Sequence, residues 1–315
     1  MEPGLLRSAD WPLIIDLYFF LGGIAGGAFV IATIANLLDS RRYRDVVRVG
    51  YYLAFLAIIP GPIFLVMDLG TPSRFLHMLM VSKPDLAIGM GAINIGPFHL
   101  KPFSPMNVGA WALIGFSGFA FLAALSMLLE DMKQARDLSG FRVVVGIIGG
   151  FLGFFVAAYP GVLLAATARP LFISAHWLGA MFLAIGASTG GAAMALIMSS
   201  MGGQAREALS RLMKVTAFTL IIQLVALILF VVSVSGAGSA GVSKALAVLL
   251  SGSYSLTFWV GVVVIGLLAP LVLQFGAGAI KKANPGMVAL VSVLVLVGGF
   301  LAKWVLIGAG QVLLS

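Results

Sequence analysis

The chain has 315 residues, of which 61% are hydrophobic and only 10% are charged, whereas a soluble domain carries about 25% charged residues. This composition excludes an ordinary soluble protein and predicts a protein embedded in a membrane. The net charge of +8 comes from basic residues scattered over short connections without forming a stripe, so it does not indicate nucleic-acid binding.

Eight apolar stretches follow one another, and each is long enough to cross a bilayer, for which a helix needs about 20 residues. We expect the spans near residues 13–37, 50–69, 106–129, 142–168, 171–198, 212–235, 254–276 and 287–312. The predicted fold is an all-α polytopic membrane protein, a bundle of eight transmembrane helices that forms a single domain over residues 1–315. The first span exceeds the roughly 7–15 residues of a signal-peptide core, so we expect it to stay in the mature chain.

The first span contains a run of small residues, Gly22-Gly23-Ile24-Ala25-Gly26-Gly27. Small residues four apart allow another helix to approach closely, and without a preceding strand they do not indicate a phosphate-binding loop. The second and fourth spans are interrupted at Pro60-Gly61-Pro62 and Tyr159-Pro160-Gly161. Such breaks are tolerated where protein or a cavity satisfies the freed backbone groups, although a simple packing kink explains them equally well.

The connection over residues 70–105 is the one long segment between spans. Apolar residues from Phe75 to Met80 suggest a short interfacial helix, and several prolines interrupt the rest of the segment. This segment is the best candidate for docking a soluble partner, but a plain surface loop fits its composition equally well.

The distribution of Lys and Arg predicts the orientation. Twelve of the 19 lie in or beside the connections that follow spans one, three, five and seven, and six lie in the N-terminal segment or the other connections. The remaining one, Lys303, lies inside the last span. Because basic residues concentrate on the cytoplasmic side, both termini are expected on the periplasmic side of a prokaryotic inner membrane.

Six polar groups from several spans are expected in the periplasmic half of the bilayer. Asp16 lies about one turn below the surface, His176 about 8 Å deep, and Tyr159 and Lys303 roughly 13 Å deep. Asp68 and Arg169 lie at span ends. A charge at the bilayer centre costs about 2.5–3.5 kcal/mol, so ionisable residues in spans indicate a functional site. The cytoplasmic half offers only Gln274 as a comparable group.

Each of these residues also has a purely structural interpretation. Asp16 and Asp68 can be carboxylates that face interfacial water, and His176 with Trp177 can belong to an aromatic belt. Lys303 can extend its stem toward the surface, and Arg169 can anchor a tight turn. Their shared side of the membrane favours one site over several independent positions.

The chain has no cysteine, which excludes iron–sulfur ligation by its own thiols. Of the three histidines, only His176 is expected inside a span, so two histidines cannot face each other across the bundle to hold a haem. We therefore expect no metal ligands, no haem and no iron–sulfur cluster in this chain.

Several segments, taken together, resemble the NrfD/polysulfide reductase membrane-subunit family. They are DLYFFLGGIAGG (16–27), DLGTPSRF (68–75), SPMNVGAW (104–111), YPGVLL with ARPL (159–164 and 168–171) and KWVLIGAGQ (303–311). The resemblance implies an eight-helix anchor without haem that reacts with menaquinone or ubiquinone near the periplasmic face. It also implies a periplasmic four-cluster iron–sulfur partner, joined by a molybdopterin catalytic subunit or a multihaem cytochrome.

The resemblance also implies site residues. Asp16 or Tyr18, Asp68, Tyr159 and Arg169 match family positions at or beside the quinone pocket. Two positions depart from the pattern: the family often has arginine at the position of Lys303, and some members have histidine at that of Tyr18. Lysine keeps the charge but loses the planar fork, so a bidentate contact is not expected there.

On this basis Tyr159 is expected to hydrogen-bond a headgroup oxygen, with Asp68 or Asp16 as the proton relay. Tyr18, Arg169, His176 and Lys303 complete the predicted binding site, with Arg169 and Lys303 either keeping the carboxylates ionised or stabilising a semiquinone anion. A secondary transporter or ion-translocating protein is the alternative, because broken helices with polar groups are typical of transporters. Its weaknesses are the off-centre polar cluster and the lack of a convincing internal repeat. A purely structural anchor is a third interpretation.

Overall fold

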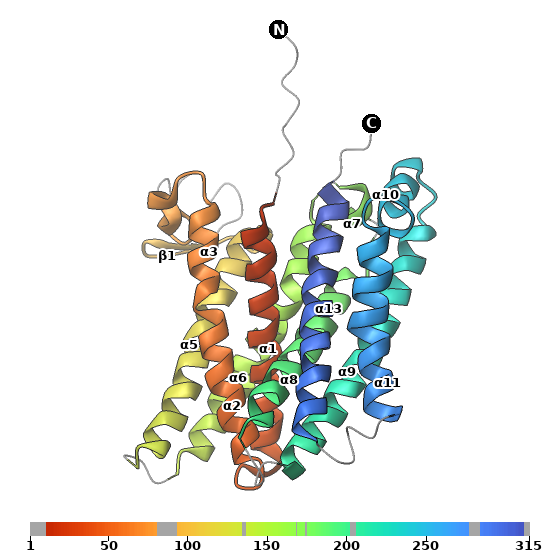
Figure 1. The fold of residues 1–315 in the computed structure, drawn as a ribbon. Coiled ribbons are helices and arrows are strands. Elements are labelled where there is room, and N and C mark those ends of the chain that lie inside the picture. Colours follow the sequence, from red (N-terminus) through yellow and green to blue (C-terminus); the bar gives the residue numbers. More distant parts are fainter. Residues whose placement is uncertain are drawn as a thin grey trace.

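The computed structural model describes residues 11–80, 93–133, 137–167, 169–173, 175–201, 206–276 and 284–311. These residues form a bundle of long helices that run roughly alongside one another (Figure 1). Trp11 and Gln311 are hydrogen-bonded to each other at one end of the bundle, which is called the terminal end below. The opposite end, where α1 (Leu13–Asp39) is followed by α2 (Arg44–Ile58), is called the charged end.

The prediction of eight spanning helices is confirmed, since the described residues contain eight helical spans that are long and apolar enough to cross a membrane. In chain order they are α1, α2 continued by α3 (Pro60–Asp68), α5 (Pro105–Asp131), α6 (Ser139–Ala165), α8 (Leu178–Ser199), α9 (Arg206–Ser235), the π-helical segment η3 (Thr257–Leu268) continued by α11 (Ala269–Gly276), and α13 (Pro285–Gln311). The chain is therefore an integral membrane protein of the all-α class.

Shorter elements cover the terminal end. They are the 3₁₀-helix η1 (Pro72–Met78), an antiparallel hairpin of β1 (Ile93–Ile95) and β2 (Phe98–Leu100), α7 (Pro170–Ile173) and α10 (Ala240–Leu250). The expected short helix near Phe75 corresponds to η1. Part of the predicted docking segment, residues 81–92, lies outside the described residues.

Helix α1 lies in the middle of the bundle and contacts α2, α3, α6, α8 and α13. The predicted role of its small residues in close packing is confirmed. At Gly27, any Cβ would overlap the carbonyl oxygen of Gly186 on α8, so only glycine allows the two backbones this approach. Because α1 is surrounded by other helices, side chains on its different faces contact different neighbouring helices.

The proline breaks have different outcomes in the two spans. Pro60 starts α3 directly after Ile59, so the second span continues as two helical segments, whereas Pro160 lies inside the uninterrupted helix α6. The ring of Tyr18 on α1 packs against Gly61, with its Cδ2 atom 3.3 Å from where a Cβ would stand. The break in the second span thus makes room for an aromatic side chain of the central helix.

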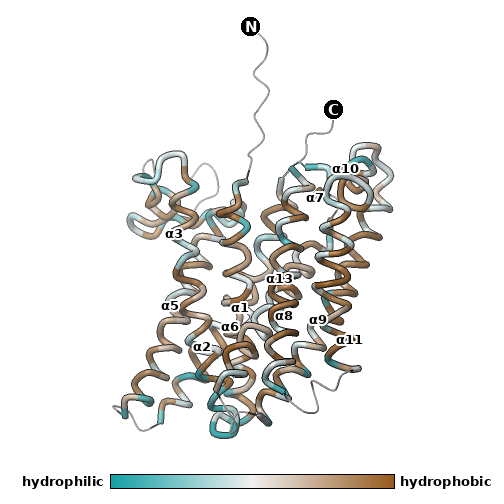
Figure 2. The backbone as a smooth tube through the Cα atoms, viewed as in Figure 1, coloured by the Kyte–Doolittle hydropathy of each residue, from teal (hydrophilic) through white to brown (hydrophobic). Residues whose placement is uncertain are grey.

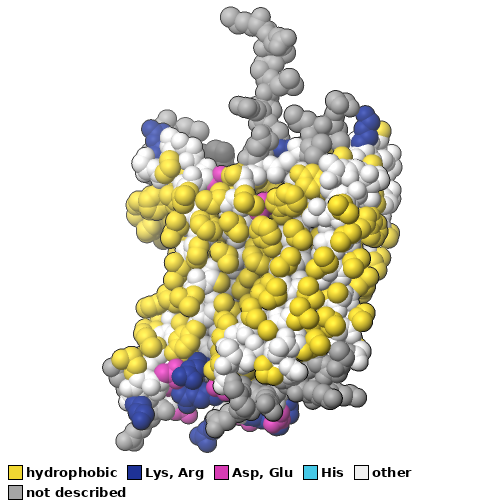
Figure 3. All heavy atoms as spheres, in the orientation of Figure 1, with side chains coloured by type: hydrophobic (Ala, Val, Ile, Leu, Met, Phe, Trp, Pro, Cys, Tyr) yellow, Lys and Arg dark blue, Asp and Glu magenta, His cyan; other side chains and the backbone are white. Residues whose placement is uncertain are grey.

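Hydrophobic residues predominate along the middle of the helices (Figure 2). On the face that Figure 3 shows, hydrophobic side chains form a broad band, and charged side chains gather beyond it at the charged end. The ion pairs that Arg42, Arg44, Arg48, Arg142 and Arg211 form with Glu130, Asp131 and Glu207 lie at the charged end. Arg142 and Glu130 form a buried pair with their nitrogen and oxygen 2.7 Å apart. The expectation that Gln274 is the only comparable polar group in this half is therefore wrong. The two residues sit on the first turn of α6 and the last turns of α5, at the margins of the predicted spans, where sequence does not show that they face each other.

Candidate functional site

A cavity of ≈140 Å³ opens at the terminal end between α1, α3, α5 and α6. Its polar lining groups are Tyr18, Asp68 and Tyr159, and the other lining residues are Trp11, Ile15, Phe19, Leu65, Met78, Met106, Gly109, Ala110 and Leu163. Three of the predicted site residues, from three different helices, are thus brought together around one apolar space.

The structure fixes the Tyr159 ring from two sides. It stacks on Phe155 one turn earlier in α6, with ring centroids 5.7 Å apart and planes inclined by 29°. Its other neighbour is Gly109 on α5, where a Cβ would lie 2.7 Å from the Cε1 atom and still closer to the end of the ring. Glycine at position 109 therefore gives the phenol its place in the cavity wall.

Both phenols are buried, with 4% of Tyr18 and 6% of Tyr159 exposed. Across the described ranges, neither hydroxyl makes a hydrogen bond to protein. Neither oxygen is among the fully buried polar atoms without a partner, and both residues line the cavity, so both hydroxyls can donate to a group that enters it. Asp68, the last residue of α3, is exposed and marks the side of the cavity that faces the end of the bundle.

Lys303 lies on the other side of α1. Its side chain is completely buried, donates to the carbonyl oxygen of Phe19 at 2.5 Å, and lies 5.2 Å from the centroid of the Phe182 ring. Because Phe19 lines the cavity, Lys303 holds the α1 backbone behind that wall. It does not itself line the cavity.

Asp16 is also buried, with 4% exposed, and its Oδ1 has no hydrogen-bond partner among the described residues. It precedes Tyr18 by two helix positions, so its side chain points to a different face of α1 from the phenol. No ion pair joins Asp16 or Lys303 to any side chain that the structure describes. The expected stabilisation of a carboxylate by Lys303 is therefore not seen.

Arg169 interacts with the end of α13. Its Nη1 donates to the carbonyl oxygens of Gln311 at 3.0 Å and Gly310 at 3.4 Å. The Gln311 side chain in turn accepts from the backbone N–H of Trp11. The last carbonyls of a helix lack partners within the helix and carry partial negative charge, so a guanidinium is favourable there. Arg169 therefore joins the ends of α7, α13 and α1 next to the cavity.

This arrangement makes a prediction for Arg169. Replacing it by Gln should destabilise the purified protein by about 1–2 kcal/mol, because charge-assisted hydrogen bonds to the end of α13 are lost. A thermal unfolding series in detergent measures the effect, with the exposed Arg74→Gln at the same end as the control. An unchanged melting temperature together with lost turnover would contradict the capping role.

The predicted depth of His176 is wrong. It is exposed in the turn between α7 and α8, and it does not line the cavity. The reason is that the apolar residues after Pro170 form a separate short helix. Leu171 and Phe172 are buried there, with the Phe172 ring against Gly310, and the spanning helix starts only at Leu178.

Sequence reasoning assigned no role to Asn107. This buried residue follows the start of α5, which Ser104 caps and Pro105 begins. Its Oδ1 accepts from the backbone N–H of Lys101 at 2.7 Å, and its Nδ2 donates to the carbonyl oxygen of Met78 at 2.5 Å. Asn107 thereby fixes η1 against α5 at the cavity. The signals for it were its place in the SPMNVGAW segment and its spacing of two residues after a helix-starting proline.

Comparison with known proteins assigns the family. The family model described as "Polysulphide reductase, NrfD" matches residues 2–315. The chain belongs to the NrfD family. Among its relatives, the protein NrfD homolog of Haemophilus influenzae is 28% identical over 96% of this chain and 94% of its own length. The C chain of the polysulfide reductase of Wolinella succinogenes is 26% identical over 96% of this chain and 93% of its own length.

Family membership confirms the resemblance that the motifs suggested. The NrfD-like segments contribute most of the site: Tyr18, Asp68, Gly109 and Tyr159 come from four of them and meet at the cavity. The fifth contributes Lys303 and Gln311, which support α1 from behind. A third relative, the C subunit of the selenate reductase of Mesobacillus selenatarsenatis, matches only 26% of this chain and 19% of its own length, at 27% identity.

Proposed function

We propose that this NrfD protein is the quinone-reactive membrane subunit of a respiratory oxidoreductase complex. The observation that carries the proposal is the cavity at the terminal end, where two buried phenols and a carboxylate from α1, α3 and α6 border one apolar space. Two of the relatives are named as components of a polysulfide reductase and a selenate reductase, which supports a place in a reductase complex.

The residues present fit a quinone. A small-molecule site is mostly apolar with a few well-placed polar groups, and here aliphatic and aromatic walls accompany two hydroxyl donors suited to carbonyl oxygens. A cavity of ≈140 Å³ accommodates a headgroup better than a whole prenylated molecule. Met106 lines the cavity and is 55% exposed, so a tail has a route toward the lipid past α5.

When bound, quinone supplies two-electron, two-proton redox chemistry. Tyr159 and Tyr18 would hold the headgroup by donating hydrogen bonds to its oxygens. Asp68, at the exposed edge, exchanges protons with water, while Asp16 is a buried carboxyl on the other face of α1. The electrons pass to or from a partner, because the chain has no cysteine to hold an iron–sulfur cluster.

The partner we propose is a periplasmic four-cluster iron–sulfur subunit that docks on the terminal end, itself bound to a molybdopterin subunit or a multihaem cytochrome. The hairpin and the turn after it expose large apolar side chains there, with Ile95 72% and Phe103 90% exposed. Met78, at the end of η1, lines the cavity, so this surface lies next to the site. The basic residues at the charged end favour the cytoplasm for that end, in the inner membrane of a prokaryote.

Filling the cavity tests the proposal. Ala110 lines it from α5, and Ala110→Trp should reduce quinone-coupled turnover of the purified complex by about 100-fold or more, since a misplaced reactant alone costs that much. Activity of the partner subunits with a soluble artificial electron donor should stay normal.

The control is Leu122→Trp on the same helix, where the side chain is 38% exposed to the lipid band. It should leave both activities unchanged. Normal quinone coupling in Ala110→Trp would contradict the proposal. Solute movement by the isolated chain in vesicles would instead favour a transporter, which typically binds near the bilayer midplane and not at one end.

A further inference from the structure

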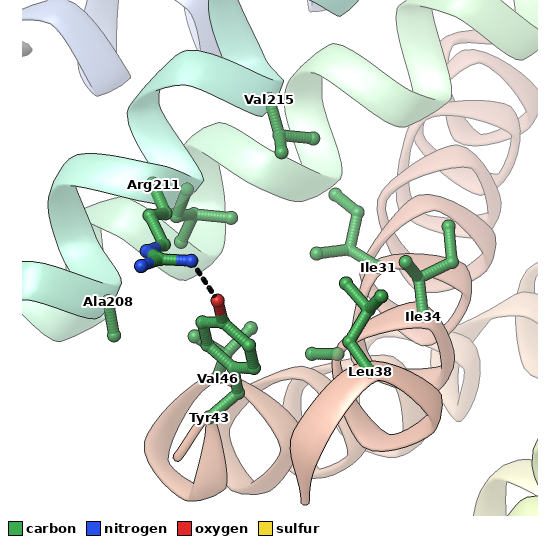
Figure 4. A pocket seen from close by; sticks show the side chains of 10 residues that line it. Ile31, Ile34, Leu38, Tyr43, Val46, Ala208, Arg211 and Val215 are labelled. Atoms are coloured by element: carbon green, nitrogen blue, oxygen red, sulfur yellow. Dashed lines mark hydrogen bonds between the residues drawn. The ribbon is translucent and has the colours of Figure 1, made fainter.

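An apolar groove runs along the outside of the bundle between α1 and α9, far from the cavity that Tyr159 lines. Two adjoining cavities form it, of ≈300 and ≈410 Å³, and both are lined by Ile31, Ile34 and Val215. The first lies at the charged end between α1, α2 and α9 (Figure 4). The second continues along α1 toward the middle of the bundle, bordered by α6 and α8.

The groove opens toward the lipid. Its rim residues Leu38 and Phe218 are 72% and 63% exposed, and Ile34 between them is 51% exposed. From Leu38 to Gly26 the groove follows α1 for roughly 18 Å, at 1.5 Å per residue. That length is close to half of the ~30 Å hydrocarbon core, which is the depth that one acyl chain reaches from one surface.

The charged end of the groove carries a polar group of defined geometry. Tyr43 and Arg211 both line it, and the Arg211 guanidinium donates to the Tyr43 hydroxyl (Figure 4). The guanidinium carbons of Arg211 and Arg42 lie 5.5 and 6.0 Å from the centroid of the Tyr43 ring. The aromatic ring therefore holds two cations at the mouth of the groove.

The two guanidinium groups have one carboxylate within ion-pair distance. Arg42 and Arg211 share one carboxylate, that of Glu207, at 2.6 and 2.9 Å. Asp39 is also near: its carboxylate accepts from the backbone N–H of Arg42 at 3.0 Å, but it forms no ion pair with either guanidinium group. In addition, the Tyr43 hydroxyl accepts from Arg211 and makes no other hydrogen bond within the described ranges, so its own proton can be donated to an acceptor.

We propose that this groove binds an anionic phospholipid, with an acyl chain along α1 and the phosphodiester at Arg211 and Tyr43. A phosphate oxygen accepts the hydroxyl proton of Tyr43 and gives Arg42 and Arg211, which share the Glu207 carboxylate, a second anion within ion-pair distance. Basic pockets between transmembrane helices are known to bind anionic lipid headgroups. A neutral quinone matches the apolar groove but not the charge, and a second copy of the chain would bring no anion of its own.

The test uses the purified complex in nanodiscs made of equal amounts of phosphatidylglycerol and phosphatidylcholine, followed by native mass spectrometry. The unaltered complex should retain phosphatidylglycerol. Arg211→Gln should lower this retention about fivefold, the factor that one basic residue near a membrane surface contributes. Lys214→Gln, an exposed residue one turn along the same helix, is the matched control and should change it little.

A second variant, Ala208→Trp, fills the groove beside Arg211 without changing its charge, and it should also lower retention. Neither residue belongs to the quinone site, so normal quinone-coupled turnover confirms that both variants are folded. Equal retention of the two lipids, or full retention in Arg211→Gln, would overturn the proposal. A copurified quinone or a second copy of the chain in the groove would overturn it as well.

Discussion

Replacing Tyr159 by Phe is expected to reduce quinone-coupled turnover by at least about 100-fold, the usual contribution of a positioned hydrogen-bond donor to a reacting oxygen. The substitution removes one hydroxyl from the cavity wall and keeps the ring that stacks on Phe155 and packs against Gly109. Assembly with partner subunits should therefore stay intact. Steady-state assays of the purified complex with a quinol, beside assays with a soluble donor, measure the difference.

The matched control is Tyr51→Phe. Tyr51 is also fully buried, but it lies on α2 away from the cavity, with its hydroxyl 3.3 Å from the Thr33 hydroxyl. Its loss should affect stability slightly and leave turnover near normal. Normal turnover in Tyr159→Phe, with complete assembly, would remove this phenol from the mechanism.

Gly109→Ala is expected to impair the same reaction from a different helix. The added Cβ would overlap the Tyr159 ring, so the ring or α5 has to shift. A displacement of about 1 Å at a reacting group can cost 100-fold in rate, and we expect a loss approaching that size. The quinol assay measures it, and the affinity for quinone should weaken in parallel.

Gly118→Ala provides the control on the same helix, because a Cβ there meets nothing within 4 Å. It should be neutral or slightly stabilising, since alanine favours the helix over glycine by about 1 kcal/mol. If the Gly109→Ala complex has normal turnover, like the Gly118→Ala control, the position of the Tyr159 ring has no bearing on catalysis.

Sequence alone was sufficient to predict the bundle. Length and apolarity define spans because a bilayer core requires about 20 residues per helix, and this requirement does not depend on tertiary contacts. The close packing of α1 was also predictable, because glycines spaced four residues apart in a transmembrane helix typically mark a close helix–helix contact. The predicted span bounds were least accurate where an apolar stretch does not belong to a spanning helix, as in α7. For that reason His176 was predicted inside a span although it lies in a turn.

The site was harder to predict. The depth of a residue in the membrane follows from its position along the helix, but which neighbouring helix its side chain faces depends on how the helices pack. Asp16 and Tyr18 are nearly level, yet they point to different faces of α1. Of the six groups expected together, only Asp68 and Tyr159 line the cavity, whereas Asp16 and Lys303 lie elsewhere around α1, Arg169 at the end of α13 and His176 in an exposed turn. Likewise, Arg169 could be placed at a span end, but its contacts at Gln311 depend on α13 lying beside α7.

The contribution of glycine and amide residues could not be inferred from charge. Gly109 and Asn107 carry none, and their roles come only from the groups they touch: the Tyr159 ring in one case and the Met78 carbonyl in the other. The buried Arg142–Glu130 pair at the charged end escaped notice for a related reason, because each residue alone resembles an ordinary loop charge.

Photoaffinity labelling with an azidoquinone tests the central claim most directly, since it locates the headgroup without relying on a variant. After illumination of the purified complex and peptide mapping, label is expected at the cavity wall, within Trp11–Phe19, Met106–Ala110 or Tyr159–Leu163. Excess unlabelled quinone should suppress it. Label confined to the groove beside Arg211, or none that competes with quinone, would contradict the account.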